Sequence, residues 1–288
     1  MSLIVILIAL LIERFWNGIQ WLRDMDLFGR YYVAVRKLFG ESEAYDGAVG
    51  VFCLMLPLIV AIGLLQQILS FDSVYLLSLV LGVVIILLCF GNNNLDNQVQ
   101  RYLLASEKKD EDDLYEVAAE MLKDAVPVNK AERDYKLVCT VLHNANDWLL
   151  AVLFWFFILG PMGAVLYRCT YVVKQHCERS NETSDFSQSI HILYGVLSWL
   201  PARLTAYAYG LAGNYSASTT NRNQDRRIEP GEWVNNNGRM MVASGLGALQ
   251  MHETGSSFPG GQVKKARRLI NRTILVWLSG IAVLTYAL

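Results

Sequence analysis

The chain of 288 residues has little charge and no long block of one sign. Only 18% of its residues are charged, and the formal net charge is −1 at pH 7. No run of Lys and Arg is long enough to follow a nucleic-acid backbone. We therefore expect no nucleic acid among its partners.

Paired cysteines and metal-binding spacings are also missing. The five cysteines show no paired spacing, and the four histidines are scattered. Cys53 and Cys89 fall inside apolar runs, where a cysteine behaves as a small hydrophobic residue. Acidic residues form no cluster with metal-ligand spacing. These absences predict neither a disulfide framework nor a metal site.

Apolar residues are abundant and gathered into long runs. They make up 53% of the chain, and 47–71, 73–95 and 148–167 carry no charge. Each run has about twenty residues, enough to cross a bilayer as a helix. Residues 1–12 are apolar as well, and they lack a basic n-region and a small-residue cleavage site, so we expect an uncleaved first helix. The composition predicts an all-α fold, a polytopic membrane helix bundle.

The distribution of basic residues predicts how the chain crosses the membrane. Lys and Arg are present between the first two runs and again in 92–147, but the link 70–73 has none. Basic segments stay in the cytoplasm, so 92–147 is predicted to be a cytoplasmic helical segment and 214–272 a cytoplasmic polar loop and helix. With further spans at 190–209 and 273–288, the prediction is one membrane domain over 1–288 with about six segments. The fifth could instead be a half-span or an interfacial helix.

The cytoplasmic parts have patterns of their own. Apolar residues recur at helical spacing in 114–122 and in 137–145, which predicts two amphipathic helices. Pro127 separates them, and Asn129 followed by Glu132 is typical of a capping box at the start of the second. Residues 215–261 are rich in Asn, Ser, Gly and Thr and are predicted to be mostly loop, either filler or a cover over a ligand.

The segment SWLPARLTAYAYG, 198–210, places Pro201 and Arg203 inside an apolar stretch. Hydrocarbon penalises a charge and an open backbone, so such residues usually face a polar cavity or lie near the interface. Arg is suited to bidentate binding of phosphate or carboxylate, which makes Arg203 a candidate for holding an anionic ligand. The alternative is an arginine that snorkels to lipid headgroups.

Other polar groups are predicted to lie near the same side of the membrane. Glu13, Asn17 and Gln20 share one helix face, although Glu13 could simply pair with Arg14 or snorkel.

HNAND, 143–147, contributes Asn144 and Asp147 at the start of the fourth span, where the helix dipole alone could account for Asp147. NNNG, 235–238, offers the side-chain amides of Asn236 and Asn237 as hydrogen-bond donors, and Gly238 would allow a ligand to approach the backbone closely. GLGAL, 245–249, follows no predicted strand and is not a dinucleotide or P-loop fingerprint.

Several of these motifs resemble the AmpE proteins. The segments are LFWFFILGPMGAVLYR (153–168), WLPARLTA (199–206) and LIALLIERFW at the N-terminus. Members of that family are inner-membrane proteins of Gram-negative bacteria linked to control of β-lactamase induction. The resemblance implies a multi-pass bacterial inner-membrane protein with a regulatory or sensory role in cell-wall stress signalling. The ligand it implies is an anionic small molecule, a nucleotide or a muropeptide.

The AmpE proteins are similar in turn to CobD and CbiB, membrane synthases that form an amide bond at the expense of ATP. NNNGRMMVASGLGAL resembles their asparagine-glycine segment. The synthases carry an asparagine-threonine-aspartate stretch after the tyrosine that matches Tyr167, where this chain has RCTYVVKQ. An ATP- and magnesium-dependent synthase is therefore the alternative function, and a transporter of a small anionic metabolite is the third. The aromatic-rich spans offer surface for a homodimer, but no run of small residues requires one.

Overall fold

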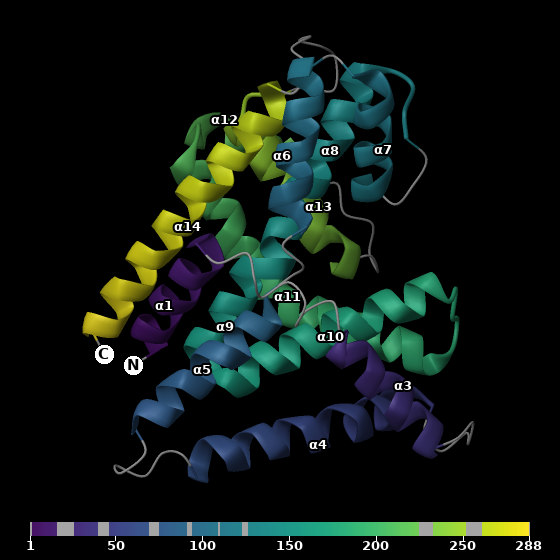
Figure 1. Cartoon of the computed structure of the whole chain (residues 1–288), viewed down its shortest axis with the longest axis vertical. Helices are drawn as coiled ribbons and strands as arrows, with labels where there is room; N and C mark the ends of the chain where they lie inside the picture. Colours follow the sequence, from purple (N-terminus) through teal and green to yellow (C-terminus); the bar gives the residue numbers. More distant parts are fainter. Residues whose placement is uncertain are drawn as a thin grey trace. The chain divides into compact units, whose positions relative to one another are not determined.

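The computed structural model describes residues 2–15, 26–39, 46–68, 75–90, 94–108, 110–122, 126–224, 233–251 and 261–287. The described residues form helices, turns and bends, with no strand among them (Figure 1). The chain divides into two compact units: Met1–Gly91 with Asp147–Trp199, and Asn92–Asn146 with Leu200–Leu288. Each is described separately below.

Apolar helices dominate the first unit. They are α1 (Ser2–Phe15), α3 (Leu27–Phe39), α4 (Gly47–Ile68), α5 (Tyr75–Cys89), α9 (Ala151–Leu159), α10 (Pro161–Arg179) and the first half of α11 (Asp185–Ala212). α10 packs against α3, α4, α5 and α9, while α1 packs on α5 and α9. α10 is therefore the helix around which this unit is built.

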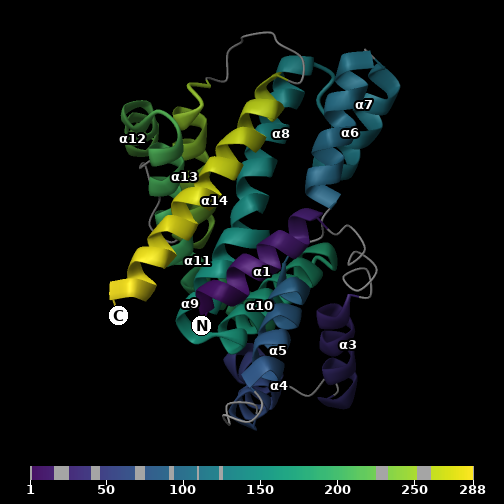
Figure 2. The ribbon, with the colours of Figure 1, turned by 60° about the vertical axis from the view of Figure 1, so that its left-hand side comes forward.

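The second unit is a bundle with its own apolar core. It contains α6 (Asn94–Lys108), α7 (Glu111–Leu122), α8 (Lys130–Ala145), the second half of α11, α12 (Tyr215–Gln224), α13 (Trp233–Ala248) and α14 (Gly261–Ala287). α6, α7 and α8 lie side by side in Figures 1 and 2, and α14 packs along α8 and α6. Leu114, Val117, Ala118 and Met121 of α7 are buried, as are Leu137, Val138, Val141 and Leu142 of α8.

Asn129 begins α8 as the sequence predicts. Its side chain accepts a hydrogen bond from the Ala131 backbone N–H at 2.9 Å, which satisfies one of the unpaired donors of the first turn. The helix ends in a π-helical turn, Asn146–Leu150, before α9 begins.

Three helices are long and apolar enough to cross a membrane: Gly47–Ile68, Lys130–Leu159 and Gly261–Ala287. Ser2–Glu13 and Leu76–Cys89 are shorter apolar helices. α11 is not among these five, although it is one continuous helix of 28 residues. Pro201 leaves the carbonyl of Leu197 without its helical donor, and the Trp155 indole N–H donates to that oxygen at 3.0 Å.

The predicted fourth span over 148–171 is interrupted at Gly160. Gly160 has φ +66° and ψ −152°, a conformation that glycine tolerates and other residues rarely adopt, and it separates α9 from α10. Pro161 then starts a new helix, where its missing N–H costs nothing. The helix long enough to cross is instead Lys130–Leu159, which begins 18 residues earlier than predicted and ends at the break.

The prediction that 215–261 is mostly loop was also wrong, because α12 and α13 occupy much of it. The glycines of this segment permit close helix packing. A Cβ added to Gly247 would lie 2.5 Å from the Ala217 carbonyl oxygen of α12, and one added to Gly238 would lie 2.7 Å from Cε1 of His143 in α8. Tertiary packing therefore stabilises helices that composition alone does not favour.

Candidate functional site

A pocket of about 800 Å³ lies in the second unit, between α8, α12 and α13. α8 lines it with residues spaced along one helix face, and α13 does the same from the opposite side. The lining residues are Tyr135, Cys139, Thr140, His143, Asn144, Asn221, Gln224, Gly238, Arg239, Val242, Ala243, Leu246 and Met251. The volume is within the range of small-molecule sites in proteins.

The lining combines a cation with neutral hydrogen-bonding groups. Arg239 supplies a guanidinium, His143 an imidazole, and Asn144, Asn221 and Gln224 supply amides. Among the described residues that line the pocket there is no carboxylate. An anionic ligand would therefore meet donors without an opposing fixed charge.

Gly238 brings α13 close to the imidazole of His143. The Cβ that any other residue would carry there would lie 2.7 Å from Cε1 and 2.9 Å from Nδ1 of His143. His143 and Arg239, which directly follows Gly238, both line the pocket. Replacing Gly238 by a larger residue would displace the ring.

Arg203 contacts α13 beside the residues that line the pocket. Its Nη1 donates to Oδ1 of Asn237 at 3.1 Å, and Asn237 is 3% exposed beside Gly238 on α13. Arg203 itself is half-buried and is not among the residues that line the pocket. Its observed contact is with the protein, where it fixes an amide next to the lining residues.

The remaining predicted residues fall in different places. Asn144 and Gly238 line the pocket, whereas Asn236 is half-buried on α13 outside the lining. Glu13 is half-buried near the end of α1 in the first unit, and Asn17 and Gln20 lie outside the described residues. Sequence reasoning missed Arg239, although it directly follows the NNNG motif.

Asp147 and Tyr167 are joined in the first unit. Asp147 is 1% exposed and accepts hydrogen bonds from the hydroxyl groups of Tyr167 at 2.9 Å and Tyr194 at 2.7 Å. A buried carboxylate in an apolar helix is costly unless its oxygens are satisfied, and here each oxygen has a tyrosine donor. The helix dipole alone would favour a carboxylate in the first turn without any such partners. The two tyrosine donors therefore make Asp147 part of a buried polar network.

This network extends along α10. Tyr171 accepts hydrogen bonds from the Trp148 indole N–H at 2.9 Å and from the Gln175 amide at 2.6 Å. The Arg168 guanidinium carbon lies 5.4 Å from the centre of the Tyr171 ring. Beyond Asp147 and Tyr167, no sequence pattern indicates this network, because tyrosines in an apolar run are equally consistent with an ordinary core.

The residue before Asp147 has a different partner. Asn146 lies in the second unit, is 2% exposed, and accepts a hydrogen bond from the Thr205 hydroxyl at 2.9 Å. Thr205 lies two residues after Arg203 on α11. The π-helical turn thus places two adjacent polar side chains in two separate hydrogen-bond networks.

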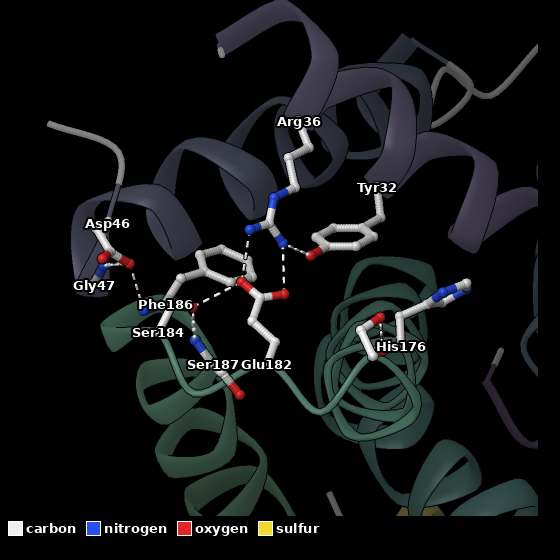
Figure 3. Close-up of polar contacts among 10 residues, drawn as sticks. Tyr32, Arg36, Asp46, Gly47, His176, Glu182, Ser184, Phe186 and Ser187 are labelled. Carbon is white, nitrogen blue, oxygen red and sulfur yellow. Dashed lines mark hydrogen bonds and ion pairs between the residues drawn. The ribbon is translucent and has the colours of Figure 1, made fainter. Parts of the chain in front are cut away.

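A third polar cluster connects α3 to the turn between α10 and α11 (Figure 3). Nη1 and Nη2 of Arg36 donate to the two carboxylate oxygens of Glu182 at 2.7 and 2.6 Å, and Arg36 also donates to the Tyr32 hydroxyl. These hydrogen bonds hold the pKa of Glu182 below its usual value. Beside them, Asp46 accepts a hydrogen bond from the Phe186 backbone N–H at 2.8 Å, so the cluster fixes several segments of this unit.

Comparison with known proteins places these features in a family. The cobalamin biosynthesis protein CobD of Chromobacterium violaceum is 31% identical to the chain over 156 residues, which cover 48% of this chain and 49% of that protein. CobD of Stutzerimonas stutzeri is 28% identical over 150 residues, 48% of each chain. The chain thus spans about half the length of the curated relatives it matches. No solved structure matches it.

A family model described as the regulatory signalling modulator protein AmpE matches residues 1–219. The match includes Arg203, the Asp147 network and the α8 wall of the pocket, but not α13. It covers well over half of the 288 residues. The chain therefore belongs to the AmpE family.

Proposed function

We propose that the chain is an inner-membrane regulatory protein that binds an anionic small molecule in the pocket between α8, α12 and α13. In this proposal ligand occupancy is signalled to the control of β-lactamase induction during cell-wall stress. Membership of the AmpE family supports the regulatory part. The observation that carries the binding part is a pocket of about 800 Å³ with Arg239, His143 and three amides and no lining carboxylate.

The polar and apolar residues that line the pocket suit different parts of one ligand. Arg239 and the amides suit phosphate or carboxylate groups. Val242, Leu246 and Met251 offer apolar contact to a base, a sugar face or a lactyl group. A nucleotide and a muropeptide both combine these features, so both are candidate ligands.

In this proposal Arg239 contacts the anion, and Arg203 acts as a positioning residue through Asn237. The polar network of Asp147, in the other unit, supports the membrane part of the protein. The six-segment topology and a cytoplasmic opening of the pocket complete the proposal, and the seven Lys and Arg residues of 92–147 support that side assignment, because the positive-inside rule counts Lys and Arg and not net charge.

The test is calorimetric titration of the full chain in nanodiscs with Mg-ATP and, separately, with an anhydro-muropeptide. Saturable binding of one of them should weaken about 10- to 100-fold in Arg239→Gln, the loss expected for a hydrogen bond to a charged group. Arg101→Gln is the matched control, because Arg101 is an exposed arginine of the same unit that pairs with Glu120. Equal affinity in the unaltered chain and in Arg239→Gln would refute the pocket.

A second candidate function is ATP-dependent amide-bond formation, which the two CobD relatives favour. It needs Mg²⁺ held by carboxylates close to phosphates. Among the described residues, no group of three His, Cys, Asp or Glu side chains could hold a metal ion. Magnesium-dependent release of phosphate from ATP by the purified chain, lost in Arg239→Gln, would establish this function in place of the regulatory one.

A further inference from the structure

α14 has two contrasting faces along its 27 residues. One face is buried and carries Val263, Ala266, Leu269, Thr273, Trp277 and Ile281, and the helix packs against α8 and α6. The opposite face is exposed. The character of that exposed face changes along the helix.

The first three turns of the exposed face are basic. Successive residues in an α-helix are about 100° apart, so Lys264, Lys265, Arg268 and Arg272 fall within an arc of about 100°. All four side chains are exposed. Over the residues that the structure describes, no ion pair is formed by any of the four, and α14 contains no Asp or Glu. We call these four residues the basic stripe.

The same arc becomes apolar towards the C-terminus. Leu275, Val283 and Tyr286 fall within it and are 64%, 67% and 97% exposed. Exposed side chains of this size on a helix of membrane-spanning length are suited to lipid chains. Along the exposed face of α14, basic residues are thus followed by apolar residues. This is the order in which a helix that enters a bilayer meets the headgroups and then the acyl chains.

We propose that the basic stripe of α14 binds the phosphate headgroups of anionic phospholipids, with the membrane surface lying near Arg272. Charge complementarity identifies the partner, because four exposed cations that form no ion pair within the described part of the chain attract an anionic surface. The apolar end of the same face supplies contact for the acyl chains. This interaction is independent of the pocket, because none of the four residues lines it.

The experiment is lipid titration of the full chain in detergent, with bound lipids resolved by native mass spectrometry. The unaltered chain should bind phosphatidylglycerol more tightly than phosphatidylcholine, and the preference should fall as ionic strength rises. The triple variant Lys265→Gln, Arg268→Gln and Arg272→Gln should lose about 100-fold in affinity for phosphatidylglycerol, with phosphatidylcholine unchanged. A value of about 1 kcal/mol per cation near an anionic surface corresponds to about fivefold for each residue.

The matched control removes three exposed cations elsewhere: Arg30→Gln, Lys37→Gln and Arg179→Gln. It should keep the preference for phosphatidylglycerol. An equal loss in the control, an unchanged preference in the triple variant, or no preference in the unaltered chain would each overturn the proposal. Far-UV circular dichroism of both variants verifies that the helices are retained.

Discussion

Gly247 provides the sharpest test of the packing around the pocket. An added Cβ would lie 2.5 Å from the Ala217 carbonyl oxygen and 2.8 Å from Cα of Ser218, both backbone atoms of α12. Backbone cannot rotate away as a side-chain end can. Gly247→Ala must therefore push α12 and α13 apart.

The size of the effect follows from two opposing contributions. Overpacking of a close interface costs about 1–3 kcal/mol, and the gain in helix propensity from Gly to Ala is about 1 kcal/mol. The shift also strains the hydrogen bond between the hydroxyl groups of Ser218 and Ser244, which are 2.6 Å apart and buried; such a bond contributes about 1 kcal/mol. We expect a net destabilisation of about 1–3 kcal/mol.

Gly280 is the matched control. It also lies inside a helix, α14, but an added Cβ would meet no atom within 4 Å. Gly280→Ala should therefore gain only the propensity term and stabilise the protein by about 0.5–1 kcal/mol. Thermal unfolding of both variants in detergent, followed by circular dichroism, compares them directly. If Gly247→Ala is as stable as Gly280→Ala, α12 and α13 do not approach as described.

Other parts of the structure make further predictions. Tyr102→Phe removes the hydroxyl that donates to the buried carboxylate of Asp134, so unfolding free energy should fall by about 1.5–3 kcal/mol, and a smaller change than in an exposed Tyr215→Phe control would contradict that contact. Asn237→Ala should weaken ligand binding in the pocket without removing it, because it releases Arg203 but leaves Arg239. Calorimetry of Asn237→Ala, of Arg203→Ala and of the double variant should show that the two losses of affinity are not additive, which measures the coupling between Arg203 and Asn237. The pKa of Glu182 is lowered in the folded protein, so its pair with Arg36 stabilises the fold above the usual glutamate pKa, and that contribution disappears as the pH falls through the lowered value. Arg36→Gln should lower Tm at neutral pH by an amount equivalent to at most about 1 kcal/mol, since Arg36 is half exposed, and the two melting curves should converge in acid; a constant difference at all pH values would exclude the ion pair as its cause.

The sequence predicted those parts of the fold that local signals determine. The apolar periodicity of α7 and α8 and the cap at Asn129 are read from neighbouring residues alone, and the structure has helices there. Pro161 indicates from the sequence that a helix could break here, but the apolar run around it is also long enough for one continuous span, so only the structure distinguishes the two. α12 and α13 were missed because their Asn, Ser and Gly content favours loops, whereas contacts between distant segments stabilise them as helices.

The candidate site was predictable only in fragments. Asn144 and Gly238, which the chemistry of their motifs indicates, line the pocket, and Asp147 and Tyr167, which lie in separate motifs, are hydrogen-bonded to each other. Arg203 stood out because charge is rare in apolar sequence, but its observed partner is Asn237. Arg239 lies in a polar segment where arginine is common, so only the three-dimensional arrangement distinguishes it.

The π-helical turn at Asn146–Leu150 has a consequence for how this gene can change. A π turn holds one residue more than an α turn, so deleting a single codon here would restore a regular turn and leave α9 nearly in its present phase. Leu153 and Phe154, which are buried, would still face their present contacts. A one-residue deletion within the turn should therefore be tolerated more readily than one inside α9, where it would rotate the side chains that follow by about 100°. Alignments with relatives that have an ordinary helix here should therefore show a gap of one residue.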